Sequence, residues 1–180
     1  MVAAALLGFA VYGFSSGAPS TVAYLGSVVI IGGVIVYFRR NPLHDARALA
    51  LALNAVIHLA GGLVQVGHDV LYDASIGPRA RSLETHLLRF DHFAHAYGSF
   101  VAMLTLWVLL VPPDLERWAR RNLLVLCALG SLGIGGLNEV IEFIATLAHS
   151  GAHVGGYSNT GWDLIFNTIG AGARGVAIDR

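Results

Sequence analysis

Charged residues are scarce in this sequence. Of its 180 residues, 12% are charged and 56% are hydrophobic, whereas a soluble domain carries about 25% charged residues. This composition excludes an ordinary soluble domain and indicates an integral membrane protein. The eleven basic residues are all arginines, and eleven acids balance them. Because there is no basic tail or block, the sequence gives no support for nucleic-acid binding.

Cysteine is limited to Cys127, which lies in an apolar run. A single cysteine excludes an internal disulfide, and we interpret it as a small core residue. The Gly-x-x-x-x-Gly-Lys loop, the Gly-x-Ser-x-Gly elbow and the His-Glu-x-x-His motif are also missing. No internal repeat or long linker divides the chain, so we expect residues 1–180 to form one integral membrane domain.

Six apolar segments are present, and a helix needs about 20 residues to cross a bilayer. They are Val2–Phe14, Thr21–Phe38, Ala48–Val66, Asp91–Val111, Leu123–Ala148 and Trp162–Ile178. The predicted fold is therefore all-α, a polytopic bundle of about six transmembrane helices. The first segment is short, and Ser16 and Ala18 are placed like a signal-peptide cleavage site. Because no basic region precedes it and Pro19 follows, we favour a short tilted helix or a truncated N-terminus.

The arginines are distributed unevenly between the loops. If six helices alternate in direction, eight arginines fall on one side: Arg39, Arg40, Arg47, Arg117, Arg120, Arg121, Arg174 and Arg180. The opposite side holds Arg79, Arg81 and Arg89. The positive-inside rule then predicts a multi-pass protein of the inner (plasma) membrane with both termini in the cytoplasm. The Pro112–Asn122 loop would be cytoplasmic, and Gly67–Arg89 and Ser150–Gly161 would face outward.

Acids, histidines and amides gather toward the outer ends of four predicted helices. They are Asn54, His58, Gln65 and Asp69 on the third segment, Asp91, His92 and His95 on the fourth, Asn138, Glu139 and Glu142 on the fifth, and Asp163 and Asn167 on the sixth. The spacing on the third segment predicts a continuous stripe on one helix face. Such groups are costly in lipid unless paired or solvated. We therefore expect a polar cluster near the extracytoplasmic face.

Three interpretations fit this cluster. Asp91 and His95 share a helix face, and so do Glu139 and Glu142, which favours a divalent-metal site. The candidate metal ligands are Asp91, His92, His95 and Asp163. The second interpretation is a hydrogen-bonded polar lock between helices. The third is a proton relay.

Further residues are candidates for supporting a substrate or the site. They are His58, Asp69, Arg89, Asn138, Asn167 and Trp162. We interpret His58 as a neutral, hydrogen-bonded core histidine rather than a ligand. For Arg89 the alternatives are an ion pair with Glu84, a contact to a lipid phosphate and a simple interface anchor.

The order of these motifs resembles the superfamily of VanZ-like and YjdF-like membrane proteins. The resemblance covers about Phe90 to Gly172 and rests on Asp-His-x-x-His, then Asn-Glu-x-x-Glu, then Gly-Tyr-x-x-Thr-Gly-Trp-Asp-x-x-x-Asn-x-x-Gly-Ala. It implies that the functional residues are Asp91, His95, Glu139, Glu142, Asp163, Asn167 and Gly170. YjdF-like members favour Asp where this chain has Asn167. VanZ-like proteins are associated with resistance to lipoglycopeptide antibiotics such as teicoplanin.

The leading functional hypothesis is a cavity lined by acids and histidines that binds, or also modifies, an amphiphilic envelope molecule. The ligand would be a membrane lipid or a lipid-linked cell-wall precursor. In an enzyme, Glu139 or Glu142 would serve as general base, while Asp91, His95 and Asp163 would position a metal or the substrate headgroup. The alternatives are a small proton- or ion-coupled transporter and a non-catalytic membrane subunit.

Overall fold

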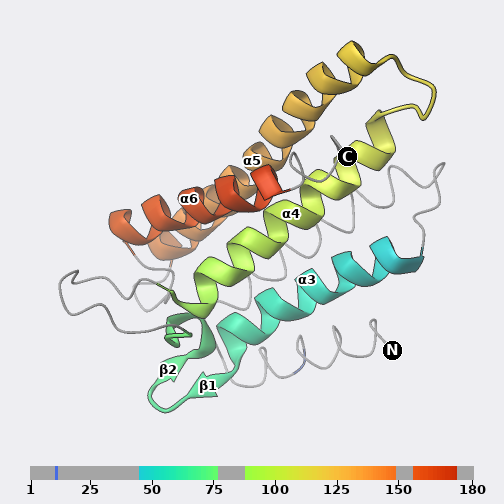
Figure 1. The fold of residues 1–180 in the computed structure, drawn as a ribbon. Helices are drawn as coiled ribbons and strands as arrows, with labels where there is room; N and C mark the ends of the chain where they lie inside the picture. The colour runs from blue at the N-terminus through green and yellow to red at the C-terminus, as the bar shows by residue number, and fades with distance from the viewer. Residues whose placement is uncertain (1–10, 12–44, 77–87, 149–155, 174–180) are drawn as a thin grey trace.

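Four helices make up most of the part of the chain that can be described. The computed structural model describes residues 11, 45–76, 88–148 and 156–173 (Figure 1). The helices are α3 (Asp45–Leu63), α4 (Phe90–Leu110), α5 (Arg117–Ala148) and α6 (Tyr157–Ala173). Between α3 and α4 lie the short antiparallel strands β1 (Gln65–Val66) and β2 (Asp69–Val70) and the 3-10 helix η1 (Leu71–Asp73).

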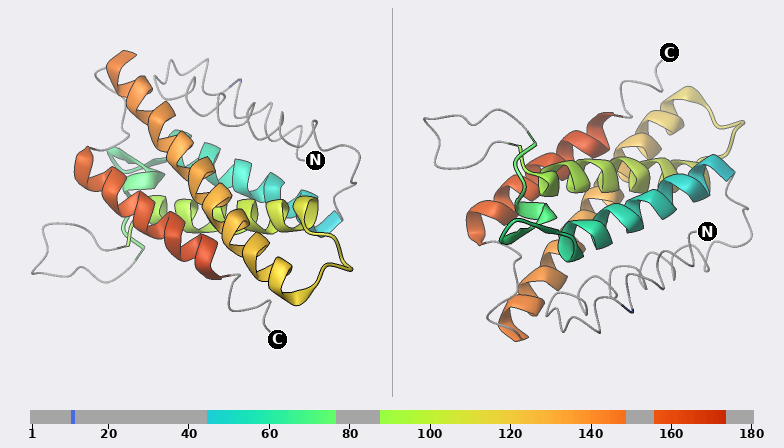
Figure 2. Two further views of the ribbon diagram at one scale, coloured as in Figure 1. Left: turned by 90° about the horizontal axis from the view of Figure 1, so that it is seen from above. Right: turned by 90° about the horizontal axis from the view of Figure 1, so that it is seen from below.

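Helix α4 is the centre of this arrangement, because α3, α5 and α6 all pack against it. Helices α3 and α4 run side by side in opposite directions, and α5 crosses α4 obliquely (Figures 1 and 2). The C-terminal end of α3 and the N-terminal ends of α4 and α6 meet at the same end of the bundle, next to η1 (Figure 1). The start of α4 therefore lies between the last turns of α3 and the start of α6.

The ends of α4 follow from local sequence. At its start Arg89 is extended, and its backbone N–H donates to His92 Nδ1 at 3.3 Å. At its end the helix stops before Pro112 and Pro113, because proline lacks the N–H that a helix needs and disfavours helical geometry in the residue before it. α4 thus spans 21 residues, enough to cross a bilayer.

Two of the helices are long and apolar enough to span a membrane, α4 and the Arg117–Ile144 part of α5. The Arg47–Leu63 part of α3 is a shorter apolar helix. The expected helical membrane fold is thus supported over the described ranges. The predicted segments Val2–Phe14, apart from helical Val11, and Thr21–Phe38 lie outside the described residues. The count of six helices accordingly stays a prediction.

The third predicted helix is shorter than expected. The predicted stripe through Gln65 and Asp69 is wrong, because α3 ends at Leu63 and the chain turns into the β1–β2 hairpin. The turn contains Gly67 at φ 69°, a conformation that glycine adopts without steric cost. Gln65 and Asp69 are exposed in the hairpin, so neither continues the helical face that carries His58.

Buried apolar side chains form two clusters along α4. One contains Leu59, Leu63, Tyr72 and Ala94, and the other contains Met103, Trp107 and Cys127. Between them α6 approaches α4 very closely. A Cβ atom placed on Gly170 would collide with the backbone carbonyl of Ala96. The absence of a side chain at Gly170 therefore lets α6 bring its polar residues against α4.

Candidate functional site

His95 lies at the centre of the polar cluster and faces carboxylates from three helices. Its Nε2 atom is 3.4 Å from Asp91 Oδ1, one turn earlier on α4, and 3.9 Å from Asp163 Oδ1 on α6. Its Nδ1 atom is 3.5 Å from Glu139 Oε1 on α5. Both ring nitrogens thus face acids, and the acids on the two sides come from different helices.

The cluster is almost completely enclosed. The exposed fraction is 3% for His95, 7% for Glu139 and 0% for Asp163. One polar atom on each of these side chains is buried without a hydrogen-bond partner among the described residues: His95 Nε2, Glu139 Oε1 and Asp163 Oδ1. Buried polar atoms nearly always have a partner, so three unsatisfied atoms around one imidazole call for a physical explanation.

Asn159 connects two of the acids. Its amide nitrogen donates to Asp163 Oδ2 at 2.6 Å and to Asp91 Oδ2 at 3.1 Å. Its amide oxygen accepts from Arg89 Nη1 at 3.3 Å, and the same guanidinium nitrogen lies 3.2 Å from Asp73 Oδ1. This chain of contacts fixes which end of the Asn159 amide faces the carboxylates and leaves the Oδ1 atom of each aspartate facing His95.

Glu142 lies three residues after Glu139 on α5. It is partly buried, and its Oε1 atom accepts a hydrogen bond of 2.7 Å from Asn138 Nδ2, four residues earlier on α5. Unlike Glu139, it therefore has a side-chain partner on its own helix.

Within the described ranges, two groups of side chains have ligand atoms close enough together to hold one metal ion. In each group the atoms lie within 4.8 Å of one another. The groups are Asp91, His95 and Asp163, and His95, Glu139 and Glu142. His95 belongs to both groups, and its Nε2 faces Asp91 and Asp163 while its Nδ1 faces Glu139.

His58 on α3 lies beside the cluster. Its Nδ1 atom is 2.7 Å from the Tyr72 hydroxyl, and its ring centroid is 6.0 Å from that of His95, with the two rings nearly perpendicular. Tyr72 reaches this position because its ring packs over Gly61, where a Cβ atom would collide with it. His58 is thus a hydrogen-bonded histidine that faces His95 edge-on.

His92 points toward aromatic side chains of α6. Its ring stacks on Phe166 with centroids 4.6 Å apart and an interplanar angle of 9°, and Trp162 lies 6.1 Å away. Its Nδ1 atom accepts from the Arg89 backbone. His92 belongs to neither group of metal-capable side chains in the described ranges; its observed contacts hold the start of α4 against α6.

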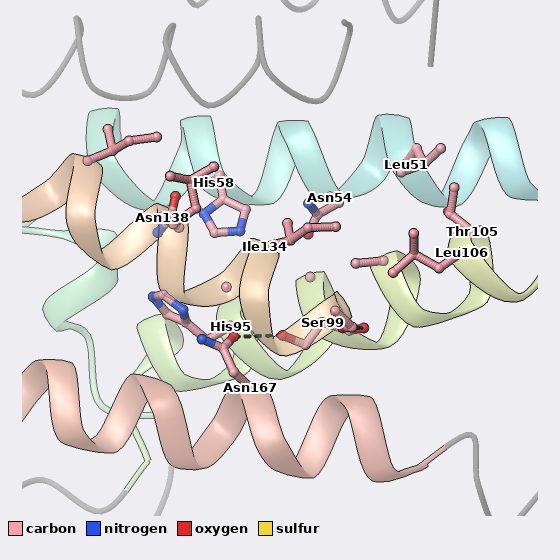
Figure 3. A pocket seen from close by; sticks show the side chains of 16 residues that line it. Leu51, Asn54, His58, His95, Ser99, Thr105, Leu106, Ile134, Asn138 and Asn167 are labelled. Atoms are coloured by element: carbon pink, nitrogen blue, oxygen red, sulfur yellow. Dashed lines mark hydrogen bonds between the residues drawn. The ribbon is translucent and has the colours of Figure 1, made fainter. Parts of the chain in front are cut away.

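A cavity of about 220 Å³ extends from His95 along α4, between α3 and α5. Histidines and amides line one end of it, and mainly apolar side chains line the other (Figure 3). The polar end includes His58, His95 and Asn138, and the other end includes Leu51, Thr105 and Leu106. The cavity is therefore polar at the cluster and increasingly apolar away from it.

Two amide side chains in the cavity wall have unsatisfied atoms. Asn167 Oδ1 accepts from Ser99 Oγ at 2.8 Å (Figure 3), but its Nδ2 atom is buried without a partner in the described part of the chain. The same is true of Asn54 Oδ1 on α3. The cavity wall thus offers one free donor, on Asn167, and one free acceptor, on Asn54.

Most of the residues singled out in the sequence meet in space, and a few do not. Asp91, His95, Glu139 and Asp163 form the cluster. Asp69 is exposed in the hairpin and lies apart from the helical face. Arg89 pairs with Asp73; Glu84, the alternative partner, lies outside the described residues.

Sequence reasoning missed Asn159, Ser99 and Tyr72. Asn159 precedes Asp163 by four residues, the spacing that places two side chains on one helix face. That spacing was a usable signal for Asn159. Ser99 lies four residues after His95 on α4 and was detectable in the same way. Tyr72 reaches His58 only because of the hairpin, so no helical spacing indicates it.

The model of one protein family matches residues 1–178, and that family is described as "Predicted membrane protein (DUF2238)". Since the match covers nearly the whole sequence, the chain belongs to this family. It is accordingly a membrane protein, in agreement with the two helices that are long and apolar enough to cross a bilayer. No curated protein and no solved structure matches the chain significantly.

Proposed function

We propose that this member of the DUF2238 family binds an amphiphilic molecule of the cell envelope. The polar head of the ligand would lie at the cluster around His95, and its apolar part would lie in the cavity along α4. The ligand would be a phospholipid or a lipid-linked precursor that enters from the outer leaflet of the plasma membrane. The proposal includes a role like that of VanZ-like or YjdF-like proteins, with a link to tolerance of glycopeptide antibiotics.

The observation that carries the proposal is the change in polarity along one cavity. The cavity wall contributes a free amide N–H from Asn167 and a free amide oxygen from Asn54. Leaving such atoms unpaired in a buried site costs about 1–3 kcal/mol each. A headgroup with both donor and acceptor atoms, such as a hydroxyl or protonated phosphate, would satisfy them. Leu51 and Leu106 at the other end would contact an alkyl chain.

A proton- or ion-coupled transporter is less well supported. A relay across the membrane needs ionisable groups at successive depths. Among the described residues that line the cavity, only His58 and His95 are ionisable, and they lie near the same end. The far end has Leu51, Thr105 and Leu106, none of which transfers protons at neutral pH.

If the bound molecule is also modified, Glu139 is the better placed general base. It faces His95 directly and has an unsatisfied oxygen, whereas Glu142 is engaged by Asn138. A base must lie within hydrogen-bond reach of the proton it removes. Glu139 is not among the described residues that line the cavity, whereas His95 is, so the proton would pass to Glu139 through the His95 imidazole.

The proposal is tested by measuring whether the purified protein retains a bound amphiphile. Native mass spectrometry in a mild detergent, followed by solvent extraction, should detect one bound lipid-like molecule per wild-type chain. Ala102 lines the cavity, so Ala102→Phe should fill it and abolish retention. Ala173→Phe makes the same change at an exposed position on α6 and should retain the ligand. A ligand-free wild type, or equal retention by Ala102→Phe, would contradict the proposal.

A further inference from the structure

We propose that Asp91 Oδ1, His95 Nε2 and Asp163 Oδ1 bind one divalent transition-metal cation, and that Glu139 positions the imidazole from its opposite nitrogen. This site is separate from the free amides of the cavity wall, and its occupancy does not depend on amphiphile binding. The residues come from α4 and α6, so the ion would join these two helices at the end where both begin.

The distances suit a shared ion. Nitrogen and oxygen ligands lie about 2.0–2.2 Å from Zn²⁺, so neighbouring ligand atoms are about 3–4 Å apart. The His95 Nε2 atom is 3.4 Å from Asp91 Oδ1 and 3.9 Å from Asp163 Oδ1. These separations are too long for strong direct hydrogen bonds, but they match two ligand atoms on either side of the imidazole nitrogen.

Unsatisfied atoms supply an independent reason to place a ligand there. His95 Nε2 and Asp163 Oδ1 are both buried without a hydrogen-bond partner in the described ranges, on side chains that are 3% and 0% exposed. A cation would engage both atoms at once. It would also offset the charge that two neighbouring carboxylates bring into an enclosed site.

The atoms around the site are arranged as a metal requires. Asn159 donates to the Oδ2 atoms of both Asp91 and Asp163, so both Oδ1 atoms are left facing His95. Carboxylates that bind metals are commonly oriented by such outer hydrogen bonds. The Arg89 guanidinium contacts the Asn159 amide oxygen at 3.3 Å and fixes the amide in this orientation.

The other imidazole nitrogen indicates which group of acids holds the ion. A metal-binding histidine usually directs its second nitrogen, as an N–H, at a carboxylate. Glu139 Oε1 is the carboxylate oxygen that faces His95 Nδ1, at 3.5 Å, and it would accept the Nδ1–H once an ion holds Nε2. Glu142 already accepts from Asn138 and is less buried, so the group His95, Glu139 and Glu142 is the weaker candidate. An imidazole with carboxylates favours Zn²⁺ or Mn²⁺ over Mg²⁺.

The experiment uses the full-length protein in detergent, stripped with a chelator and titrated with ZnCl₂. Elemental analysis after desalting should give about one Zn²⁺ per chain, and Zn²⁺ should raise the thermal unfolding temperature while Mg²⁺ does not. Asp91→Asn and Asp163→Asn should lose the bound Zn²⁺. Glu139→Gln should weaken Zn²⁺ binding by about 10- to 100-fold, the effect expected of an orienting partner.

Two variants serve as controls. Glu142→Gln tests the alternative group, and Asp114→Asn removes an exposed acid in the loop between α4 and α5; both should bind Zn²⁺ like the wild type. Absence of both Zn²⁺ binding and a Zn²⁺-dependent thermal shift in the wild type would overturn the proposal, without the need for any variant to fold. Loss of Zn²⁺ binding in Glu142→Gln, with retention in Asp163→Asn, would show that the ion is bound by His95, Glu139 and Glu142 instead. That result would also refute the proposal.

Discussion

His95 Nδ1 on α4 lies 3.5 Å from Glu139 Oε1 on α5. Both side chains are buried, at 3% and 7% exposure, and the Glu139 oxygen has no hydrogen-bond partner among the described residues. A pair that served only to join two helices would be expected to form a closer hydrogen bond. The relationship favours a site that is organised for a ligand.

The close approach of α6 to α4 should depend on Gly170. A methyl group there would collide with the Ala96 backbone, so Gly170→Ala should lower the free energy of unfolding by about 3 kcal/mol, the upper part of the range for overpacking. Thermal unfolding in detergent measures the effect. Gly172→Ala is the matched control, because a Cβ atom at Gly172 meets nothing within 4 Å. Equal stability of the two variants would show that α6 does not pack as described.

The Asn54 side chain should contribute to ligand binding and not to the stability of the fold. Its Oδ1 atom is buried without a partner in the described structure, so Asn54→Leu removes an unsatisfied acceptor while roughly keeping the shape. The ligand-free protein should become more stable by about 1 kcal/mol, and retention of the amphiphile should fall. Thermal unfolding and native mass spectrometry measure these two effects. A destabilised Asn54→Leu variant with full ligand retention would count against a polar role for this wall.

The orientation in the membrane can be read from cysteine labelling. In a Cys127→Ala background, cysteines at exposed Ser75 and Ser158 should react with a membrane-impermeant thiol reagent in intact cells. A cysteine at exposed Asp114, in the predicted cytoplasmic loop, should react only after lysis. The reverse pattern would invert the topology and place the cluster beneath the cytoplasmic face instead.

The sequence predicts the acids of the cluster well because helical spacing determines which side chains share a face. Asp91 and His95 are four residues apart on one helix, and the alternation of helices places Glu139 and Asp163 at a similar depth. Residue spacing does not predict where a helix ends within an apolar run. The stripe through Gln65 and Asp69 failed because the chain leaves the helix after Leu63.

Contacts that depend on the path of a loop or on a close helix crossing also could not be predicted from the sequence. Tyr72 meets His58 through the hairpin and η1, and no periodic pattern connects residues that far apart in such a segment. The donation from Asn159 to two aspartates depends on α6 lying directly against α4, which follows from the packing at Gly170. The metal and amphiphile roles of the cluster stay predictions, as does the number of membrane helices.

The most direct test of the central claim is the thermal stability of the double variant Asp91→Asn with Glu139→Gln, measured in detergent after chelator treatment. The substitutions keep shape and hydrogen-bonding capacity but remove two buried charges. A buried ionic cluster often contributes little net stability, because desolvation offsets attraction, and functional sites are commonly held at some cost to stability. We predict an unfolding temperature equal to or above that of the stripped wild type, together with loss of Zn²⁺ binding. A variant that unfolds several degrees earlier, or fails to accumulate in the membrane, would show that the cluster is a structural lock and contradict the account.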